Sequence, residues 1–316
     1  MSFGQGKYVY RVVEGWGKHF YSPFVDVVGL GVDSKDQVYI FIRGGIDPVL
    51  VFDSEGNFIR SWGRDTFSWP HGLLVGLDDS VYCTDGDHTV RKFTPDGKLL
   101  MTLGKKNQPS ETGCVGRDWR TVKRAAGPFN CPTHVALDRE GNLYISDGYG
   151  NARVHKFSKD GELLLSWGEP GTGPGQFNLV HGVCVDGEGT IYVADRENSR
   201  IQLFDQKGRF LTQWSANRPT DLCIHDGILY VSELGYGRVH EEARASRLSI
   251  LTLDGKLLSH WGSMEGCSPG NFLAAHDLCV DSKGSIYVGE VVITSVGARG
   301  PVPANCHTLQ KFVRVG

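Results

Sequence analysis

The chain is built from an internal repeat, and that repeat restricts it to a few architectures. Each copy contains an apolar strand, a turn of Asp-x-x-Gly type, an aromatic-rich strand, a third strand that ends in a turn, and a fourth strand that ends near Trp-Gly. Tight turns between alternating strands indicate antiparallel pairing within each copy. The copies recur at about forty residues, which is the period of a four-stranded propeller blade. The sequence therefore predicts an all-β six-bladed β-propeller.

Six copies account for most of the chain. They cover residues 28–63, 70–104, 132–168, 180–214, 219–262 and 275–316. The sixth copy lacks its Trp-Gly strand, whereas residues 7–17 form an unpaired strand of that type, ending in Trp16-Gly17. We expect this N-terminal strand to complete the last blade, because closure removes open sheet edges and ties down the terminus. Residues 1–316 are then expected to form a single domain.

Composition and charge exclude several classes of function. The formal net charge is −3, so the chain lacks the basic footprint of a nucleic-acid-binding protein. No apolar run reaches the roughly 18 residues that span a membrane, and the N-terminus lacks the apolar region of a signal peptide. We expect a cytoplasmic protein without a nucleic-acid or membrane partner, and the sequence leaves its oligomeric state open.

The eight cysteines fall into two groups. Those in predicted blade strands are expected to be buried free thiols, which are common in protein cores: Cys83, Cys184, Cys223 and Cys279. Those in loops could form disulfides: Cys114, Cys131, Cys267 and Cys306. No C-x-x-C motif is present, so a structural zinc site built from cysteines is not expected.

Two long loops interrupt the repeat, at residues 105–131 and 291–306. The first carries Trp119 and a group of basic residues: Lys105, Lys106, Arg117, Arg120, Lys123 and Arg124. The second is rich in Gly, Pro and Val. Long loops in compact domains are usually functional or mobile. The first loop is either a solvated decoration or a basic lid suited to an anionic substrate.

Histidine occupies one repeat position in alternate copies. The first residue of each apolar strand is, in order, Val28, His71, Thr133, His181, Thr220 and His276. If six blades close into a ring, the three histidines point at one axis from three directions. Three imidazoles that leave a fourth position open are the ligand set of a catalytic zinc ion. A lone histidine here would more often be a satisfied polar residue, but three at equivalent positions favour a metal site.

A second repeat position carries ionisable residues at the end of each second strand. These are Arg43, Asp85, Asp147, Asp195, Glu233 and Glu290. We expect the five acids chiefly to accept hydrogen bonds from backbone N–H groups at the blade turns. Arg43 breaks the pattern, and Tyr149 and Arg196 follow nearby acids. With the three histidines, these side chains form a plausible acid–base and anion-binding set.

Four segments resemble the blade motifs of peptidyl-α-hydroxyglycine α-amidating lyase. They are residues 144–153, residues 192–202, Trp69-Pro70-His71-Gly72-Leu73 and Ala275-His276-Asp277-Leu278. The resemblance covers nearly the whole chain. It implies a six-bladed propeller of NHL-type repeats that cleaves a carbinolamide and releases an amide and glyoxylate.

The resemblance also implies two metal ions and three catalytic side chains. A catalytic zinc ion would take three ligands: His71, His181 and His276. A structural calcium ion would be held by two main-chain carbonyls and one carboxylate: those of Leu30, Leu73 and Asp277. Tyr149 would be the catalytic tyrosine, and Arg43 and Arg196 the active-site arginines. From ligand chemistry alone, iron, cobalt or manganese would also suit three histidines.

This chemistry is physically consistent. Zinc favours loss of a hydroxyl proton, a tyrosine beside an arginine can act as a base, and an arginine can grip a carboxylate with two hydrogen bonds. We therefore expect a small anionic substrate.

The chain departs from the family pattern in two ways. In the family, the residue after the catalytic tyrosine is a disulfide cysteine; here it is Gly150, and Cys131 lies one residue away from the expected partner position. The absent bridge is consistent with a reducing compartment. In animals the enzyme works with a copper monooxygenase that makes its substrate, and this chain has no room for such a domain. A separate monooxygenase would then supply the substrate, and peptide amidation as the biological task is open.

Two alternative functions remain. A metal-dependent lactonase or esterase usually centres on acidic and amide ligands to calcium, which three histidines argue against. A non-catalytic NHL propeller that binds a protein or RNA would have no metal and an exposed basic or aromatic face.

Overall fold

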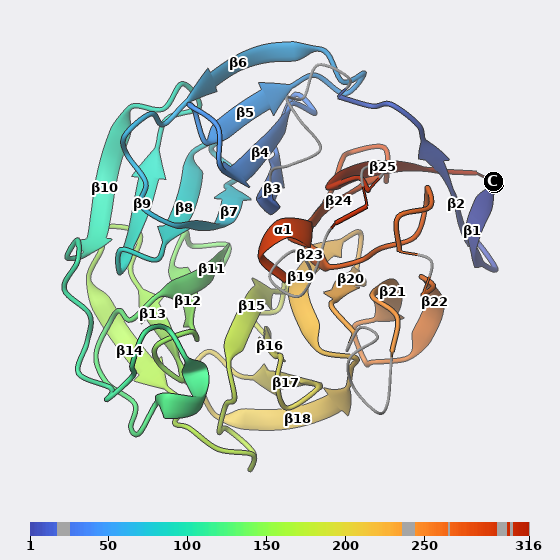
Figure 1. The fold of residues 1–316 in the computed structure, drawn as a ribbon. Coiled ribbons are helices and arrows are strands. Elements are labelled where there is room, and N and C mark those ends of the chain that lie inside the picture. Colours follow the sequence, from blue (N-terminus) through green and yellow to red (C-terminus); the bar gives the residue numbers. More distant parts are fainter. Residues whose placement is uncertain (18–25, 236–243, 265, 296–301, 304–305, 316) are drawn as a thin grey trace. The chain divides into compact units, whose positions relative to one another are not determined.

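The computed structural model describes residues 1–17, 26–235, 244–264, 266–295, 302–303 and 306–315. The fold is an all-β six-bladed β-propeller, which confirms the prediction from the repeat (Figure 1). Five sheets have four antiparallel strands, and the sixth has five. Contacts divide the chain into two compact units: the first contains residues 1–64 and 223–316, and the second contains residues 65–222. A single domain over residues 1–316 stays a prediction.

The second unit contains the second, third and fourth blades, each a four-stranded meander (Figure 1). The second blade is β7 (Pro70–Val75), β8 (Val81–Asp85), β9 (Thr89–Phe93) and β10 (Leu99–Gly104). The third is β11 (Pro132–Leu137), β12 (Leu143–Asp147), β13 (Arg153–Phe157) and β14 (Leu163–Trp167). The fourth is β15 (Val180–Val185), β16 (Ile191–Asp195), β17 (Arg200–Phe204) and β18 (Phe210–Ser215). A short 3-10 helix, η1 (Trp119–Thr121), lies in the long loop between β10 and β11.

The first unit contains the first and sixth blades and most of the fifth. The first blade is β3 (Asp26–Val32), β4 (Val38–Arg43), β5 (Val49–Phe52) and β6 (Phe58–Trp62). The fifth is β19 (Pro219–His225), β20 (Ile228–Glu233), β21 (Arg247–Thr252) and β22 (Leu257–Trp261), and the boundary between the units falls within β19. The sixth blade contains β23 (Ala275–Val280), β24 (Ile286–Glu290) and β25 (Leu309–Arg314), with α1 (Val292–Ser295) after β24. Residues 296–301 and 304–305, half of the expected 291–306 loop, lie outside the described residues.

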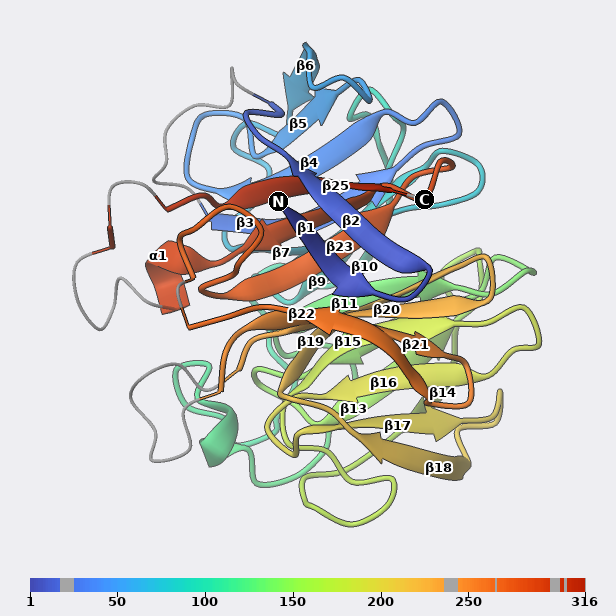
Figure 2. The same ribbon diagram turned by 90° about the vertical axis from the view of Figure 1, so that its right-hand side faces the viewer.

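The N-terminus completes the sixth blade, as the sequence predicts. β2 (Tyr8–Val13) pairs antiparallel with β25, with Val12 opposite Phe312. Figure 2 shows both termini on this one sheet. The structure adds a strand that the repeat does not contain, because β1 (Ser2–Gln5) folds back on β2 as a hairpin.

The Asp-x-x-Gly signal forms the same turn wherever it joins the first and second strands. In the third blade, Asp138 Oδ1 accepts hydrogen bonds from the main-chain nitrogens of Glu140 and Asn142, at 3.0 and 2.9 Å. The turn needs a positive φ at Gly141, which is 84° and suits glycine. A carboxylate that accepts two N–H groups replaces the ladder bonds that the turn interrupts.

The hydrophobic cores lie between neighbouring blades. Between the third and fourth blades of the second unit, Tyr144, Trp167, Phe177 and Phe204 pack with aliphatic residues of β11, β13, β15 and β16. Burying each such side chain contributes roughly 1.5–3 kcal/mol. The aromatic-rich second strand and the Trp-Gly ending are therefore packing signals, because they supply the layer between blades.

Candidate functional site

The three repeat-position histidines lie in β-bulges at the start of the innermost strands. Pairing with the second strand shifts in register around each one: between Pro70 and Leu73 for His71, between Val180 and Val183 for His181, and between Ala275 and Asp277 for His276. A bulge places an extra residue against its partner strand and redirects a side chain, which is why bulges often lie beside functional sites. All three histidines are buried.

Each histidine makes the same hydrogen bond to the next blade. Nδ1 contacts the main-chain oxygen of the residue that holds the equivalent repeat position: Thr133 for His71 at 2.8 Å, Thr220 for His181 at 2.8 Å, and Val28 for His276 at 3.2 Å. A carbonyl oxygen can only accept, so Nδ1 carries the hydrogen. In a neutral imidazole, Nε2 then carries the lone pair.

This tautomer is the one that binds a metal through Nε2. A carbonyl that accepts from the other ring nitrogen fixes the tautomer and the orientation of such a ligand. The donor set therefore fits a borderline-soft divalent metal such as zinc. Within the second unit, the His71 and His181 rings lie with their centroids 4.8 Å apart. His276 belongs to the first unit and has the equivalent bulge and hydrogen bond there.

Aromatic rings surround the His71–His181 pair. The centroid of the Tyr149 ring lies 5.3 Å from that of His71 and 5.9 Å from that of His181. Trp69 contacts Tyr149 edge-on, with centroids 5.4 Å apart, and also lies 5.4 Å from the His71 ring. The structure thus brings Tyr149 to the two histidines, as the resemblance implies.

Arg196 is held against the Tyr149 phenol. Its Nη1 atom lies 3.2 Å from the Tyr149 hydroxyl, and its guanidinium carbon lies 5.5 Å from the ring centroid. On its other side, Nε donates to Glu197 Oε1 at 2.8 Å. Burial would lower the pKa of Arg196, but Tyr149 and Glu197 raise it above its ordinary value. The buried guanidinium therefore remains charged.

Glu197 joins Arg196 to a second arginine. Arg218 Nη2 donates to Glu197 Oε1 at 2.6 Å, and its Nε donates to Oε2 at 3.2 Å. Burial would raise the pKa of Glu197, but Arg196 and Arg218 lower it below its ordinary value. Two guanidinium groups thus share one carboxylate, so the cluster keeps a net positive charge beside Tyr149. The sequence did not predict Arg218, because only its contact with Glu197 in the structure places it at the site.

Part of the basic 105–131 loop lies at the same site. Arg117 is an exposed residue whose guanidinium carbon lies 4.7 Å from the Trp69 ring centroid, in cation–π contact. Lys123 and Arg124, by contrast, are exposed and point no charged group at these rings in any described contact. From the sequence, Arg117 is expected only as part of the basic loop and Trp69 only as part of a family motif, so their contact is a finding of the structure.

The remaining predicted site residues lie mostly in the first unit. Arg43 ends β4, where its Nη1 donates to Thr294 Oγ1 at 3.3 Å. Asp277 Oδ1 accepts a hydrogen bond from the Leu30 main-chain nitrogen at 2.9 Å, so the carboxylate and that residue are adjacent. Leu73 lies in β7 of the second unit. The calcium ion stays a prediction.

Four of the five acids at the ends of the second strands accept hydrogen bonds from backbone N–H groups, as expected. Asp85 accepts hydrogen bonds from the Ser68 and Trp69 nitrogens at 2.7 Å, and Asp195 accepts one from the Asn178 nitrogen at 2.7 Å. Glu290 and Asp147 likewise accept backbone N–H groups of the loop before the innermost strand. Glu233 instead binds Arg247 and Ser249. Asp85, Asp147, Asp195 and Glu290 therefore tie the preceding loop to the blade.

The cysteines behave partly as expected. The four strand cysteines are free thiols, three of them buried, and burial raises the pKa of Cys83 well above its ordinary value. Among the loop cysteines, Cys267 and Cys306 form a disulfide, while Cys114 and Cys131 are free. A disulfide is typical of proteins from oxidising compartments. The cytoplasmic location stays a prediction, and this bond counts against it. No helix in the described ranges has the length and apolar character needed to cross a membrane.

Comparison with known sequences shows two groups of relatives. The NHL repeat family matches residues 129–157 and 177–204. NHL repeat-containing protein 3 of Homo sapiens is 32% identical over 313 residues, which cover 92% of this chain and 84% of that protein. Peptidyl-alpha-hydroxyglycine alpha-amidating lyase 1 of Drosophila melanogaster is 35% identical over 199 residues, covering 58% of this chain and 34% of that protein.

Comparison with solved structures supports the fold. A streptogramin B lyase matches with a TM-score of 0.62 at 11% identity, covering 96% of this chain and 97% of that one. A gluconolactonase of Xanthomonas campestris matches with a TM-score of 0.60 at 16% identity, covering 92% and 86%. At these identities the similarity shows the propeller fold alone.

Proposed function

Since this chain belongs to the NHL-repeat family of NHL repeat-containing protein 3, with amidating lyases among its other relatives, we propose that it is a metal-dependent lyase. Its substrate would be a carbinolamide of the α-hydroxyglycine type or a related 2-hydroxy acid, and its products an amide and glyoxylate. The observation that carries this proposal is the Tyr149–Arg196 contact beside two histidines whose Nδ1 atoms are both bonded to carbonyls.

We propose that His71, His181 and His276 together bind the metal, with zinc as the favoured ion. Their equivalent bulges and equivalent Nδ1 hydrogen bonds support a shared role. A zinc ion held there would supply Lewis-acid chemistry that favours loss of a hydroxyl proton. A calcium ion held by Asp277 and the carbonyls of Leu30 and Leu73 would be structural.

The side chains of this chain account for the rest of the reaction. The Tyr149 oxygen takes the proton of the carbinol hydroxyl, and the adjacent Arg196 guanidinium stabilises negative charge there. The carbon–nitrogen bond breaks as the hydroxyl oxygen forms the aldehyde carbonyl of glyoxylate, and the amide nitrogen regains a proton. The net positive charge of the Arg196–Glu197–Arg218 cluster suits the substrate carboxylate, with Arg43 as the second proposed active-site arginine.

Glyoxylate release from α-hydroxyhippurate, with elemental analysis of the same protein, tests the proposal. His71→Ala and His181→Ala should each lose bound metal and activity together, whereas His260→Ala, at an exposed position on β22, should lose neither. A purified protein that holds no transition metal and releases no glyoxylate would favour the non-catalytic scaffold. Hydrolysis of a lactone or ester instead would favour the alternative hydrolase.

A further inference from the structure

Tyr149 lies between two glycines that are both in close contact with the main chain or side chain of another segment. A Cβ added at Gly148 would lie 1.8 Å from the Val180 oxygen, and one at Gly150 would lie 2.1 Å from Asn130 Oδ1. Neither position therefore has room for a side chain. The segments that contain Val180 and Asn130 therefore pack tightly against the main chain on either side of Tyr149.

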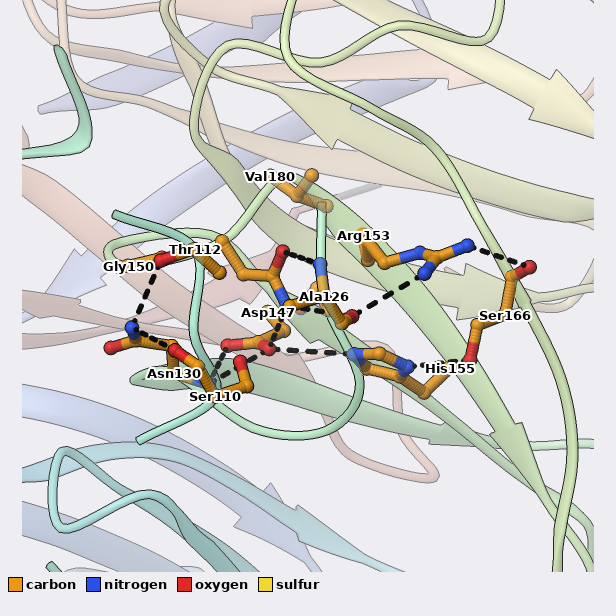
Figure 3. Close-up of polar contacts among 12 residues, drawn as sticks. Ser110, Thr112, Ala126, Asn130, Asp147, Gly150, Arg153, His155, Ser166 and Val180 are labelled. Carbon is orange, nitrogen blue, oxygen red and sulfur yellow. Dashed lines mark hydrogen bonds and ion pairs between the residues drawn. The ribbon is translucent and has the colours of Figure 1, made fainter. Parts of the chain in front are cut away.

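The segment that packs against Gly150 is the end of the 105–131 loop. Gly150 N donates to the Asn130 oxygen at 2.9 Å, and the Thr112 hydroxyl donates to the Gly150 oxygen at 2.5 Å. Asn130 Nδ2 in turn donates to Thr112 Oγ1 at 3.1 Å and to the Ser110 oxygen at 3.1 Å. Figure 3 shows Ser110, Thr112 and Asn130 around Gly150, the residue that follows Tyr149.

The same group is anchored to the third blade. Asn130 N donates to both carboxylate oxygens of Asp147, at 3.0 and 2.9 Å (Figure 3). Asp147 also accepts from Asn151 Nδ2 at 2.9 Å. Thr112 and Asp147 are fully buried. Buried hydrogen-bonded networks whose members are satisfied hold a single geometry, because breaking any contact leaves a desolvated polar group.

We infer that Thr112 and Asn130 are positioning residues for Tyr149. They hold the Tyr149–Gly150 main chain from the loop side, so that the phenol stays beside Arg196 and the two histidines. Part of the 105–131 loop is therefore a brace for the site, and Arg117 of the same loop contacts the Trp69 ring. The inference deepens the proposed function and rests on it only for the kinetic readout.

Thr112→Val tests this with little change of shape, because valine keeps the β-branch and loses the hydroxyl. We expect kcat for glyoxylate release to fall by about 10–100-fold with KM nearly unchanged, the effect of a small displacement of a reacting group. Hydrogen exchange at the Gly150 amide should become faster, because its partner segment is released. Thr112→Ser restores the hydroxyl and should recover both values.

Thr89→Val is the matched control. Thr89 is also fully buried in the second unit, and its hydroxyl donates to Asp87 Oδ1 at 2.5 Å, away from Gly150. Thr89→Val should lower the free energy of unfolding by about as much as Thr112→Val does. It should leave kcat and the exchange rate of the Gly150 amide unchanged. If Thr112→Val does not fold, Asn130→Ala replaces it with the same expected result.

Distinct outcomes separate this inference from the proposed function. In Thr112→Val, faster exchange of the Gly150 amide with an unchanged kcat would overturn the positioning role. An unchanged exchange rate would overturn the claim that Thr112 and Asn130 hold the Gly150 main chain. A wild-type protein that releases no glyoxylate would refute the proposed function instead. In that case the position of the Tyr149 ring, compared between crystals of wild type and Thr112→Val, decides the brace, and an unmoved ring overturns it.

Discussion

Gly148→Ala should disable the site while leaving the blades folded. An alanine Cβ there would lie 1.8 Å from the Val180 oxygen, and real Cβ atoms essentially never come within 3.0 Å of a heavy atom outside their own residue and its chain neighbours. The Tyr149 segment or the start of β15 must therefore move by more than about 1 Å. Gly148 has no positive φ, so the conflict is one of space alone.

The size of the effect follows from that displacement. Moving a reacting group by about 1 Å costs roughly 10²-fold in rate, and overpacking of this kind costs about 1–3 kcal/mol in stability. Val180 directly precedes His181, so a shift of β15 would also disturb a proposed metal ligand. We expect kcat for glyoxylate release to fall about 100-fold, and the urea midpoint to fall with the slope unchanged.

Gly127→Ala is the matched control, because Gly127 lies in the 105–131 loop, has a negative φ and has nothing within 4 Å of its added Cβ. It should be neutral in rate and within about 0.5 kcal/mol in stability. Wild-type kcat and stability in Gly148→Ala would refute the close packing of Gly148 on Val180.

Three further predictions concern charge, pH and redox state. Arg196→Lys should raise KM for α-hydroxyhippurate by about 10-fold or more, because lysine loses the planar fork, and a neutral amide analogue should show no such difference. Burial lowers the pKa of His307 but Glu290, at 3.2 Å, raises it above its ordinary value of 6.5. The stability lost in His307→Asn should therefore be largest below pH 6.5 and shrink as the pH rises through the folded pKa; urea unfolding at several pH values measures it, and a pH-independent difference would contradict this ion pair. Reducing the Cys267–Cys306 bond, which spans 39 residues, should lower the free energy of unfolding by about 4 kcal/mol in wild type and have no effect in Cys267→Ser.

The sequence predicts the fold well because its signals are local. Turn glycines such as Gly141 and strand endings such as Trp167-Gly168 recur at blade spacing, and the unpaired strand ending at Trp16 indicates how the sixth blade closes. β1 was missed because Ser2–Gln5 lacks the apolar alternation of a strand. It is held by its hairpin with β2 and by a hydrogen bond from the Gln5 main-chain nitrogen to Ser259 Oγ at 2.9 Å.

The site is less predictable because it depends on contacts between distant segments. Repeat position selects the histidines, yet their bulges arise from the pairing of two strands, which one strand's pattern does not reveal. The contact of Arg218 with Glu197 depends on a left-handed φ of 50° at Arg218, which no residue preference favours. The choice of Cys267 and Cys306 among four loop cysteines likewise required their positions in space.

The shared hydrogen bond of the three histidines has an evolutionary consequence. Each ring fastens its own blade to the next through Nδ1, independently of anything that Nε2 does. A descendant that abandoned chemistry would still lose roughly 0.5–1.5 kcal/mol by discarding any one of these rings. Selection for folding alone would therefore favour keeping the histidines in a relative that lacked the activity. The hydrogen bond between Arg196 and Tyr149 joins the third blade to the fourth in the same way, so the presence of these side chains does not by itself mark an enzyme.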